Sequence, residues 1–404
     1  MNNNMYFPGL KDVVVTNVEE SGEVVQIHVE MELKVHLCPR CQKKTIKVHD
    51  YRIQKIQHLK WFERKTHLFY RRRRYVCECG KRFSENNPFV KRYQRTSIEW
   101  NQVISIRSIK GKTFKETAEN YGSSTTTVVR RFDQISKSEI HPVKELPPVI
   151  AIDEYKGDTS EGKYQLIVAN PITKEPIDIL PNRNKKTIKQ YLKAHGGNVQ
   201  VVIMDMSPSF KAAVQEALGR PVIIADHFHF CRYIYWALDG VRRRVQKDFH
   251  SYDRKKCKRM RHIFYKANER LTEEERWYLD RYLKMSDELR KAYELKEAYR
   301  AWFLHAKEIG EDQIYTVKKE LKEFYKMVED TGIKEMCQAV KTFKNWQIEI
   351  LNSFVYRYSN GFLEGINNST KVLKRNAFGF KNYERFRAKI LLQHKFKRIG
   401  VNIG

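Results

Sequence analysis

The sequence lacks three features that would assign it to other classes of protein. No uninterrupted apolar run approaches the roughly 18 residues that a membrane-spanning helix needs, so we expect no membrane partner. The N-terminus has neither the basic nor the apolar stretch of a signal peptide, so we expect a cytoplasmic protein. Seven cysteines, an odd number, argue against a disulfide framework.

Acidic residues are too few to balance the basic ones. The 404 residues include 77 lysines and arginines but 48 aspartates and glutamates, which leaves a formal net charge of +29. This charge predicts a polyanionic partner, and nucleic acid is favoured over lipid because no membrane segment is expected. The chain is also longer than one ordinary core requires, so we expect two to four domains.

Alternating apolar and polar residues at 24–33, with strand-like residues at 67–70, predict a small β domain near the N-terminus. Two close cysteine pairs accompany these segments: Cys38-x-x-Cys41 and Cys77-x-Cys79. Closely spaced thiolates on two turns suit Zn²⁺, so we expect one structural zinc ion. The second pair is one residue shorter than usual, and His36 or His49 could replace one of its cysteines.

Residues 96–137 have the helical period, with a break at 121–124 between short helices expected at 113–120 and 125–135. Two such helices around a turn are typical of a helix-turn-helix unit. The second helix would present polar and basic side chains to DNA: Thr125, Thr126, Arg130 and Arg131. Helical hairpins with polar faces also occur without DNA, and the basic composition favours the DNA-binding interpretation.

A third region mixes strands and helices. Strands are expected at residues 149–153, 163–169, 176–180, 199–205 and 222–226, and helices at 185–194 and 209–218. Their order is that of a ribonuclease-H-like α/β core. A long helical region follows at 227–352, and two more helices are expected at 363–375 and 383–397.

Two of these apolar strands end in a carboxylate, Asp153 and Asp205. Such carboxylates on neighbouring strands converge at one edge of a sheet, although a single aspartate there is more often a turn former. Together they suit Mg²⁺ or Mn²⁺, which prefer hard oxygen ligands. Two ions roughly 3.5–4 Å apart can activate an attacking oxygen and stabilise a leaving one, which is the chemistry of phosphodiester cleavage.

A third acid is available on the helix expected at 363–375. One face of that helix would carry a carboxylate, two carboxamides and a lysine: Glu364, Asn367, Asn368 and Lys371. This set suits a metal ion beside a DNA phosphate. Taken alone, the pattern favours the simpler interpretation, a solvated helix face.

Motifs along nearly the whole chain resemble the DDE-type insertion-sequence transposases of the ISL-three family. Besides the cysteine pairs and the helix-turn-helix, the resembling segments are Ile152-Asp153-Glu154, Met204-Asp205-Met206-Ser207, Ala225-Asp226-His227-Phe228-His229, Asn360-x3-Glu364-Gly365-x-Asn367-x3-Lys371 and Asn376-x-Phe378-Gly379-Phe380-x-Asn382-x3-Phe386-Arg387. The resemblance implies a transposase in which Asp153, Asp205 and Glu364 are catalytic and hold two Mg²⁺ or Mn²⁺ ions. The shortened Cys77-x-Cys79 pair departs from the family pattern and puts the zinc ligand set in doubt.

The resemblance also implies partners and further parts of the site. The partners would be the terminal inverted repeats of a mobile element, target DNA, and further copies of the chain in a homodimer or higher homo-oligomer. The 159-residue interval between Asp205 and Glu364 fits a helical insertion. Asp226-x-x-His229 resembles an accessory motif near the site, with a histidine that caps the next helix as the alternative.

Additional DNA contacts are expected from basic residues in the helical regions: Arg242, Arg243, Arg244, Lys374 and Arg375. Aromatic residues nearby could stack on an unpaired base, although aromatics at helical spacing are more often core: Tyr233, Tyr235, Trp236, Phe249 and Tyr252.

The expected domains are a zinc-binding domain at 1–92, a helix-turn-helix domain at 93–140, a ribonuclease-H-like core at 148–230 and 353–404, and an α-helical insertion at 231–352. The C-terminal part of the core would carry Glu364. Two rival functions stay open: a DNA-binding regulator descended from a transposase, which does not need Asp153 or Asp205, and a nuclease of the same fold that cleaves without joining.

Overall fold

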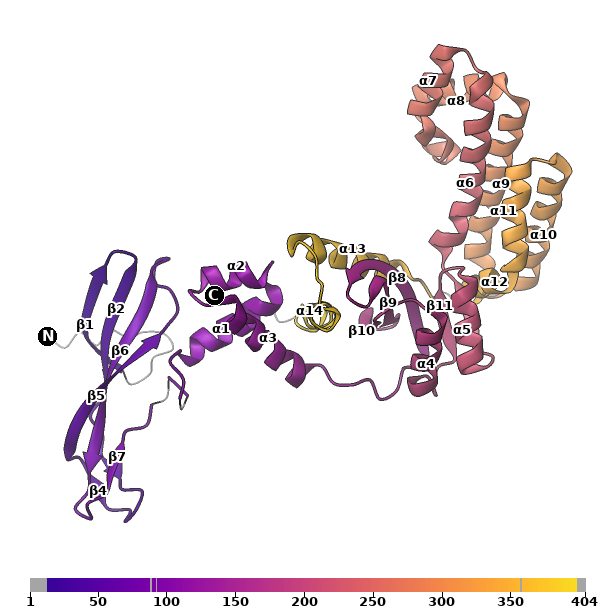
Figure 1. The fold of residues 1–404 in the computed structure, drawn as a ribbon. Helices are drawn as coiled ribbons and strands as arrows, with labels where there is room; N and C mark the ends of the chain where they lie inside the picture. The colour runs from indigo at the N-terminus through magenta and orange to yellow at the C-terminus, as the bar shows by residue number, and fades with distance from the viewer. Residues whose placement is uncertain (1–12, 88, 92, 357, 398–404) are drawn as a thin grey trace. The chain divides into compact units, whose positions relative to one another are not determined.

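The computed structural model describes residues 13–87, 89–91, 93–356 and 358–397. The chain forms two compact units, Met1–His141 with Lys395–Gly404, and Pro142–His394 (Figure 1). No helix within the described ranges is long and apolar enough to cross a membrane.

The first unit begins with a sheet in which strands follow the order β1-β2-β6-β5, with β7 also paired to β6. Its strands are β1 (Val13–Ser21), β2 (Val24–Met31), β5 (Val48–Gln57), β6 (Lys65–Val76) and β7 (Arg82–Ser84), and a separate pair is formed by β3 (His36–Leu37) and β4 (Lys44–Thr45). The alternation predicted at residues 24–33 is confirmed in β2, where Val25, Ile27 and Val29 are buried. Because β5 ends this order, one of its backbone edges is left for other segments of the chain.

Three helices follow in the same unit: α1 (Ile98–Lys110), α2 (Phe114–Asn120) and α3 (Thr125–Glu139). Each begins after a hydroxyl residue whose side chain accepts a backbone N–H, namely Ser97, Thr113 and Ser124. Gly122 has φ +62°, which lets the chain turn between α2 and α3. The two short helices predicted around this turn are therefore confirmed.

The second unit is built on a five-stranded sheet with the order β10-β9-β8-β11-β12. The strands are β8 (Val149–Thr159), β9 (Gly162–Asn170), β10 (Glu175–Leu180), β11 (Val201–Met204) and β12 (Val222–Ala225), with α4 (Lys185–His195) and α5 (Pro208–Leu218) between them. The first three strands pair antiparallel, whereas β8, β11 and β12 are parallel. The mixed α/β pattern predicted from the sequence is confirmed.

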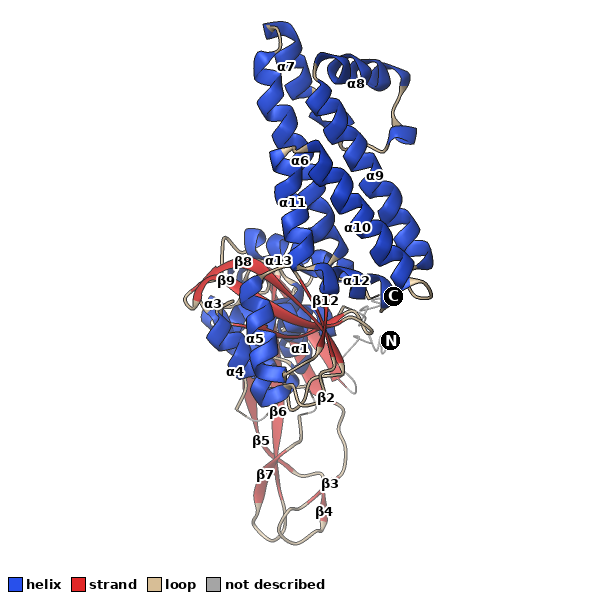
Figure 2. Ribbon diagram, turned by 90° about the vertical axis from the view of Figure 1, so that its right-hand side faces the viewer, coloured by secondary structure: helices blue, strands red, loops and turns tan. Residues whose placement is uncertain are grey.

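The elements after β12 in the described ranges are all helical, and Figure 2 shows these helices in blue. They are α6 (His227–Val245), α7 (Ser251–Arg259), α8 (Glu273–Met285), α9 (Asp287–Ile309), α10 (Ile314–Thr331), α11 (Lys334–Asn345), α12 (Gln347–Val355), α13 (Gly361–Asn376) and α14 (Tyr383–Lys395), with short 3-10 turns at Gln246–Asp248, Arg261–Phe264 and Asn268–Arg270. Helices α4 and α5 share one buried cluster with alternate strand residues such as Ile150 and Val202. Helices α13 and α14 share another cluster with the intervening residues, such as Ala151 and Ile203. The sheet therefore has a helix layer on each face, and α13 lies against β8.

Candidate functional site

Three aspartates lie level with one another at one edge of this sheet. The parallel pairing of β11 with β8 ends two residues before Asp205 and Asp153. The pairing of β12 with β11 ends one residue before Asp226 and Asp205. The strand register therefore brings three acidic side chains from distant parts of the chain to the same place.

The predicted end of the strand at Asp153 is wrong. β8 continues to Thr159, because its other edge remains paired with β9 as far as Gly162. Only the pairing with β11 stops near Asp153, so the aspartate lies inside a strand that has lost one neighbour. The expected convergence of Asp153 and Asp205 still follows, since it depends on that pairing.

Asp205 is in contact with the first turn of α6. His229 Nε2 lies 3.0 Å from Asp205 Oδ1 and 3.8 Å from Asp226 Oδ2. Ligand atoms of these three residues all lie within 4.8 Å of one another, a geometry that could hold a metal ion. Asp226 precedes α6 and its side chain makes no capping hydrogen bond, so it faces the cluster instead.

Asp153 is the most perturbed carboxyl group of this cluster. Burial, reinforced by the negative charge of Asp205, raises the pKa of Asp153 to about 7. Burial also raises the pKa of Asp226, against the opposing effect of His229. Crowding of these acids in a partly buried place concentrates negative potential at the sheet edge.

Helix α13 reaches the cluster through Asn367. The Asn367 side-chain amide donates a 2.6 Å hydrogen bond to Asp153 Oδ2, and its own Oδ1 is buried without a hydrogen-bond partner. Glu364 lies three residues earlier, on the same face of the helix, and is exposed. In the described ranges the Glu364 side chain forms no hydrogen bond or ion pair. Asn368 and Lys371, also on this face, are exposed and contact each other at 3.4 Å.

An arginine that the sequence reasoning did not single out lies behind His229. Arg232 donates from a terminal nitrogen to His229 Nδ1 at 3.0 Å. Because arginine only donates, Nδ1 must accept, and the ring proton lies on Nε2, facing Asp205. The Arg232 guanidinium lies 5.1 Å from the ring centre of Phe228 and 4.7 Å from that of Trp236. The spacing of three residues between His229 and Arg232 on α6 is compatible with this contact but does not specify it.

The four paired cysteines of the first unit come together. Cys38 Sγ lies 3.6 Å from Cys79 Sγ, and Cys41 Sγ lies 3.5 Å from Cys77 Sγ. All four sulfurs lie within 4.8 Å of one another, a geometry that could hold a metal ion without His36 or His49. Burial opposes ionisation of Cys38, but backbone hydrogen bonds from Cys41 and Arg40 lower its pKa to about 6.

The residues predicted to contact DNA in the helix-turn-helix unit lie in the first half of α3. Thr125, Thr126 and Arg130 are exposed, whereas Arg131 is half-buried and donates to Gln134 at 3.1 Å. Val128 is buried with Trp100 and Ala118 in the small core behind them. The polar face of α3 is therefore available at its N-terminal end.

Three of the five other predicted DNA contacts are engaged within the protein. Arg242 is 3 % exposed and donates to Asp239 and Gln246 on its own helix. Arg244 is held by Glu288 and Glu335, and Lys374 pairs with Asp158 at 2.5 Å. Arg243 and Arg375 are exposed.

Some of the aromatic residues considered for base stacking pack within the protein, whereas others are exposed. Phe249 stacks on Tyr282 within the helical region, and Tyr235 packs on Tyr265. Tyr233 is half-buried beside Trp236. Trp236 is 53 % exposed and Tyr252 is 62 % exposed, so these two rings remain accessible.

Comparison with known proteins agrees with this arrangement. A family described as "Transposase" matches residues 150–390. A family described as "zinc-finger of transposase IS204/IS1001/IS1096/IS1165" matches residues 34–79, and the "Helix-turn-helix domain of transposase family ISL3" matches residues 85–136.

Two curated proteins are similar to the chain. The "Transposase for insertion sequence element IS1001" of Bordetella parapertussis is 24 % identical over 385 residues, which cover 92 % of each chain. A Lactococcus lactis subsp. lactis protein named "ATP-dependent protease" is 32 % identical over 116 residues, which cover 29 % of this chain and 34 % of that protein. The second match is too short to assign a function.

The α/β unit, the zinc-finger and helix-turn-helix matches and the long match to a transposase define a DNA transposase. Because the transposase family matches more than half of the chain, the protein belongs to the ISL3 (ISL-three) family of insertion-sequence transposases. The resemblance predicted from the motifs is confirmed, and neither the regulator nor the simple nuclease is favoured.

Proposed function

We propose that the second unit is a ribonuclease-H-like catalytic core in which Asp153, Asp205 and Glu364 carry the chemistry of transposition. The observation that carries this proposal is the hydrogen bond from Asn367 to Asp153, which holds α13 at the edge where Asp153 and Asp205 converge. Glu364 is one helical turn from Asn367, and rotation of its exposed side chain could direct the carboxylate toward the same edge. The sheet order, with three antiparallel strands followed by two parallel ones, supports the fold assignment.

The residues at this edge fit divalent cations. Asp153 and Asp205 supply hard oxygen ligands, and the unpartnered Oδ1 of Asn367 is a further oxygen in the same place. Two Mg²⁺ or Mn²⁺ ions held there would increase the acidity of water and neutralise charge on the reacting phosphate. His229 and Asp226 would orient Asp205 from the other side, and Arg232 would fix the tautomer of His229.

The proposed reaction has two steps that need no external energy source. Water attacks phosphorus at the end of the element, the P–O3′ bond breaks, and the 3′ oxygen leaves with a proton as a hydroxyl. That 3′-hydroxyl then attacks a target phosphorus and loses its proton, while the target's own 3′ oxygen leaves. One phosphodiester bond forms as one breaks, with no covalent bond to the protein.

We further propose how the other parts serve this reaction. Residues 1–92 would form the zinc-binding domain around Cys38, Cys41, Cys77 and Cys79, and 93–140 the helix-turn-helix domain. The core would comprise 148–230 and 353–404, with 231–352 as an inserted helical domain. The first two domains would bind the terminal inverted repeats, and at least two copies of the chain would hold both ends. The protein would therefore act in the bacterial cytoplasm, on the chromosome.

Additional DNA contacts are proposed for exposed side chains alone. On α3 these are Thr125, Thr126 and Arg130, and elsewhere Arg243 and Arg375. Base stacking is proposed for Trp236 and not for Phe249, which is stacked in the helical core.

Incubation of the full chain with labelled paired element ends, target DNA and Mg²⁺ tests the proposal. The expected products are cleaved ends and joined strands, both absent for Glu364→Gln, whereas Glu384→Gln on α14 serves as a control and remains active. Cleavage without joining by the unaltered protein would favour the nuclease. Full activity of Glu364→Gln would remove Glu364 from the site.

A further inference from the structure

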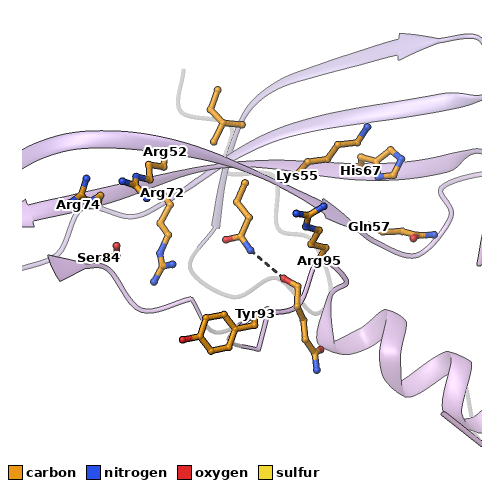
Figure 3. A pocket seen from close by; sticks show the side chains of 12 residues that line it. Arg52, Lys55, Gln57, His67, Arg72, Arg74, Ser84, Tyr93 and Arg95 are labelled. Carbon is orange, nitrogen blue, oxygen red and sulfur yellow. Dashed lines mark hydrogen bonds between the residues drawn. The ribbon is translucent and has the colours of Figure 1, made fainter. Parts of the chain in front are cut away.

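A basic groove with no assigned role lies in the first unit (Figure 3). It has a volume of about 780 Å³ and is bordered by β5, β6 and the segment that leads to α1. Five of its twelve lining residues are arginine or lysine, and none is aspartate or glutamate: Arg52, Lys55, Arg72, Arg74 and Arg95. We call this surface the β5 groove.

Two cations of the β5 groove face each other across neighbouring strands, an arrangement that destabilises the sheet. Arg52 on β5 lies directly opposite Arg72 on β6 in the antiparallel register. Like charges directly opposite each other destabilise a sheet. The neighbouring pair, Asp50 opposite Arg74, is the favourable arrangement and makes a 2.8 Å ion pair. Folding alone therefore does not account for the arginine at position 52.

Two of the five cations are fixed and three are not. Arg72 donates to the carbonyl of Glu85 at 2.7 and 3.1 Å, and Arg74 is held by Asp50. Across the described part of the chain, Arg52, Lys55 and Arg95 have no carboxylate within ion-pair distance. These three charges are available to an anion that enters the groove.

The groove is joined to the helix-turn-helix unit through Gln57. The Gln57 side chain lines the groove, and its Nε2 donates to the carbonyls of Tyr121 at 3.1 Å and Gly122 at 2.8 Å. Those carbonyls belong to the turn just before α3. The Gln57 backbone also exchanges hydrogen bonds with Arg95 and Ser97, directly before α1. The groove therefore keeps a fixed position relative to the exposed start of α3.

We infer that the β5 groove binds the phosphate backbone of duplex DNA next to the segment contacted by α3. This inference rests on the proposed binding of element ends by the first unit. Guanidinium and ammonium groups without a protein anion are suited to phosphate, and such contacts position a protein without reading sequence. The groove would lengthen the footprint of the helix-turn-helix unit and fix its orientation on the duplex.

The test uses the full chain with Arg52→Ala, Lys55→Ala and Arg95→Ala combined, and a labelled duplex of the element end. Binding should weaken about tenfold or more at moderate salt, and the slope of log affinity against log salt should become about 3 units less steep. A random duplex should lose the same factor, because the contacts carry no sequence information. The hydroxyl-radical footprint should shorten on one side only.

The matched control removes three exposed lysines from α10, Lys318, Lys319 and Lys322, with the same change in net charge. Equal weakening by both triple variants would show an effect of net charge and overturn the inference, as would unchanged binding by the groove variant. Weaker binding of single-stranded but not duplex DNA would also overturn it, and would point to stacking on Tyr93, which is 89 % exposed. If only the inference about the groove is wrong, the core still cleaves DNA. If the proposed reaction is wrong, the protein binds element ends but does not cleave them.

Discussion

Asn367 donates a 2.6 Å hydrogen bond to Asp153, a residue 214 positions earlier in the chain. This contact joins α13 to the central strand of the sheet at the level of Asp205. Through Asn367, the contact also fixes where Glu364, one helical turn earlier, lies relative to Asp153. The first prediction follows from this dependence.

Replacement Asn367→Ala should lower the cleavage rate by about ten- to a hundredfold and raise the Mg²⁺ concentration needed for half-maximal activity. The change removes one of two donors to the partly buried Asp153 carboxylate, leaving the Glu154 backbone N–H at 2.7 Å, and releases α13 locally. Cleavage rates across a Mg²⁺ titration measure this effect. Asn198→Ala, at an exposed position before β11, is the control and should behave as the unaltered protein. Equal activity of the two variants would show that the contact does not position the site.

Elemental analysis of the purified protein should find about one zinc ion per chain, bound by the four clustered thiolates. Cys77→Ser should abolish zinc binding and weaken DNA binding, because the turns that carry the cysteines lose their common centre. His36→Ala should retain zinc, since the ring packs on Tyr75 outside the sulfur cluster. Zinc-free but folded protein, or zinc loss in His36→Ala, would contradict this ligand set.

Arg232→Ala should slow cleavage without weakening end binding, because His229 would lose the donor that fixes its tautomer. Arg232→Lys should restore part of the rate, since lysine can also donate. Arg254→Ala on α7 removes the same charge from an exposed position and serves as the control. A parallel loss of binding and cleavage would instead make Arg232 a DNA contact.

Lys389 on α14 should make stability depend on pH. It is 1 % exposed, and burial lowers its pKa to about 8. The folded chain therefore binds fewer protons than the unfolded chain between about pH 8 and 10.5, and stability rises with pH across that window. The rise should amount to at most about 3 kcal/mol, and Lys389→Met should flatten it. Denaturant unfolding at pH 7 and pH 10, with exposed Lys381→Met as control, checks the prediction.

Local patterns predicted much of the fold because they need no distant partner. β2 follows from alternation, and the turn before α3 follows from Gly122 between two capped helices. β6 was predicted at 67–70 but extends to Val76. Residues 71–74 are four consecutive arginines, so the alternation of apolar and polar residues that indicates a strand is absent there. Arg73 is nevertheless buried, because Glu30 and Glu85 pair with it.

Only the part of the candidate site that lies on strands, or directly after them, could be predicted from the sequence. Asp153 and Asp205 follow from strand placement, whereas the contact between Asn367 and Asp153 depends on the packing of a helix far along the chain. The roles of Arg232 and Gln57 depend on side-chain contacts that no spacing rule specifies. The internal partners of Arg242 likewise could not be read from a basic run.

The most direct test of the account is cleavage by Asp153→Asn, measured with end binding on the same labelled duplex in the presence of Mg²⁺. Asparagine keeps the size of the side chain but removes the charge that the proposed reaction needs. We expect end binding to be unchanged and cleavage to be lost. Cleavage by Asp153→Asn at the rate of the unaltered protein would contradict the proposed catalytic carboxylates.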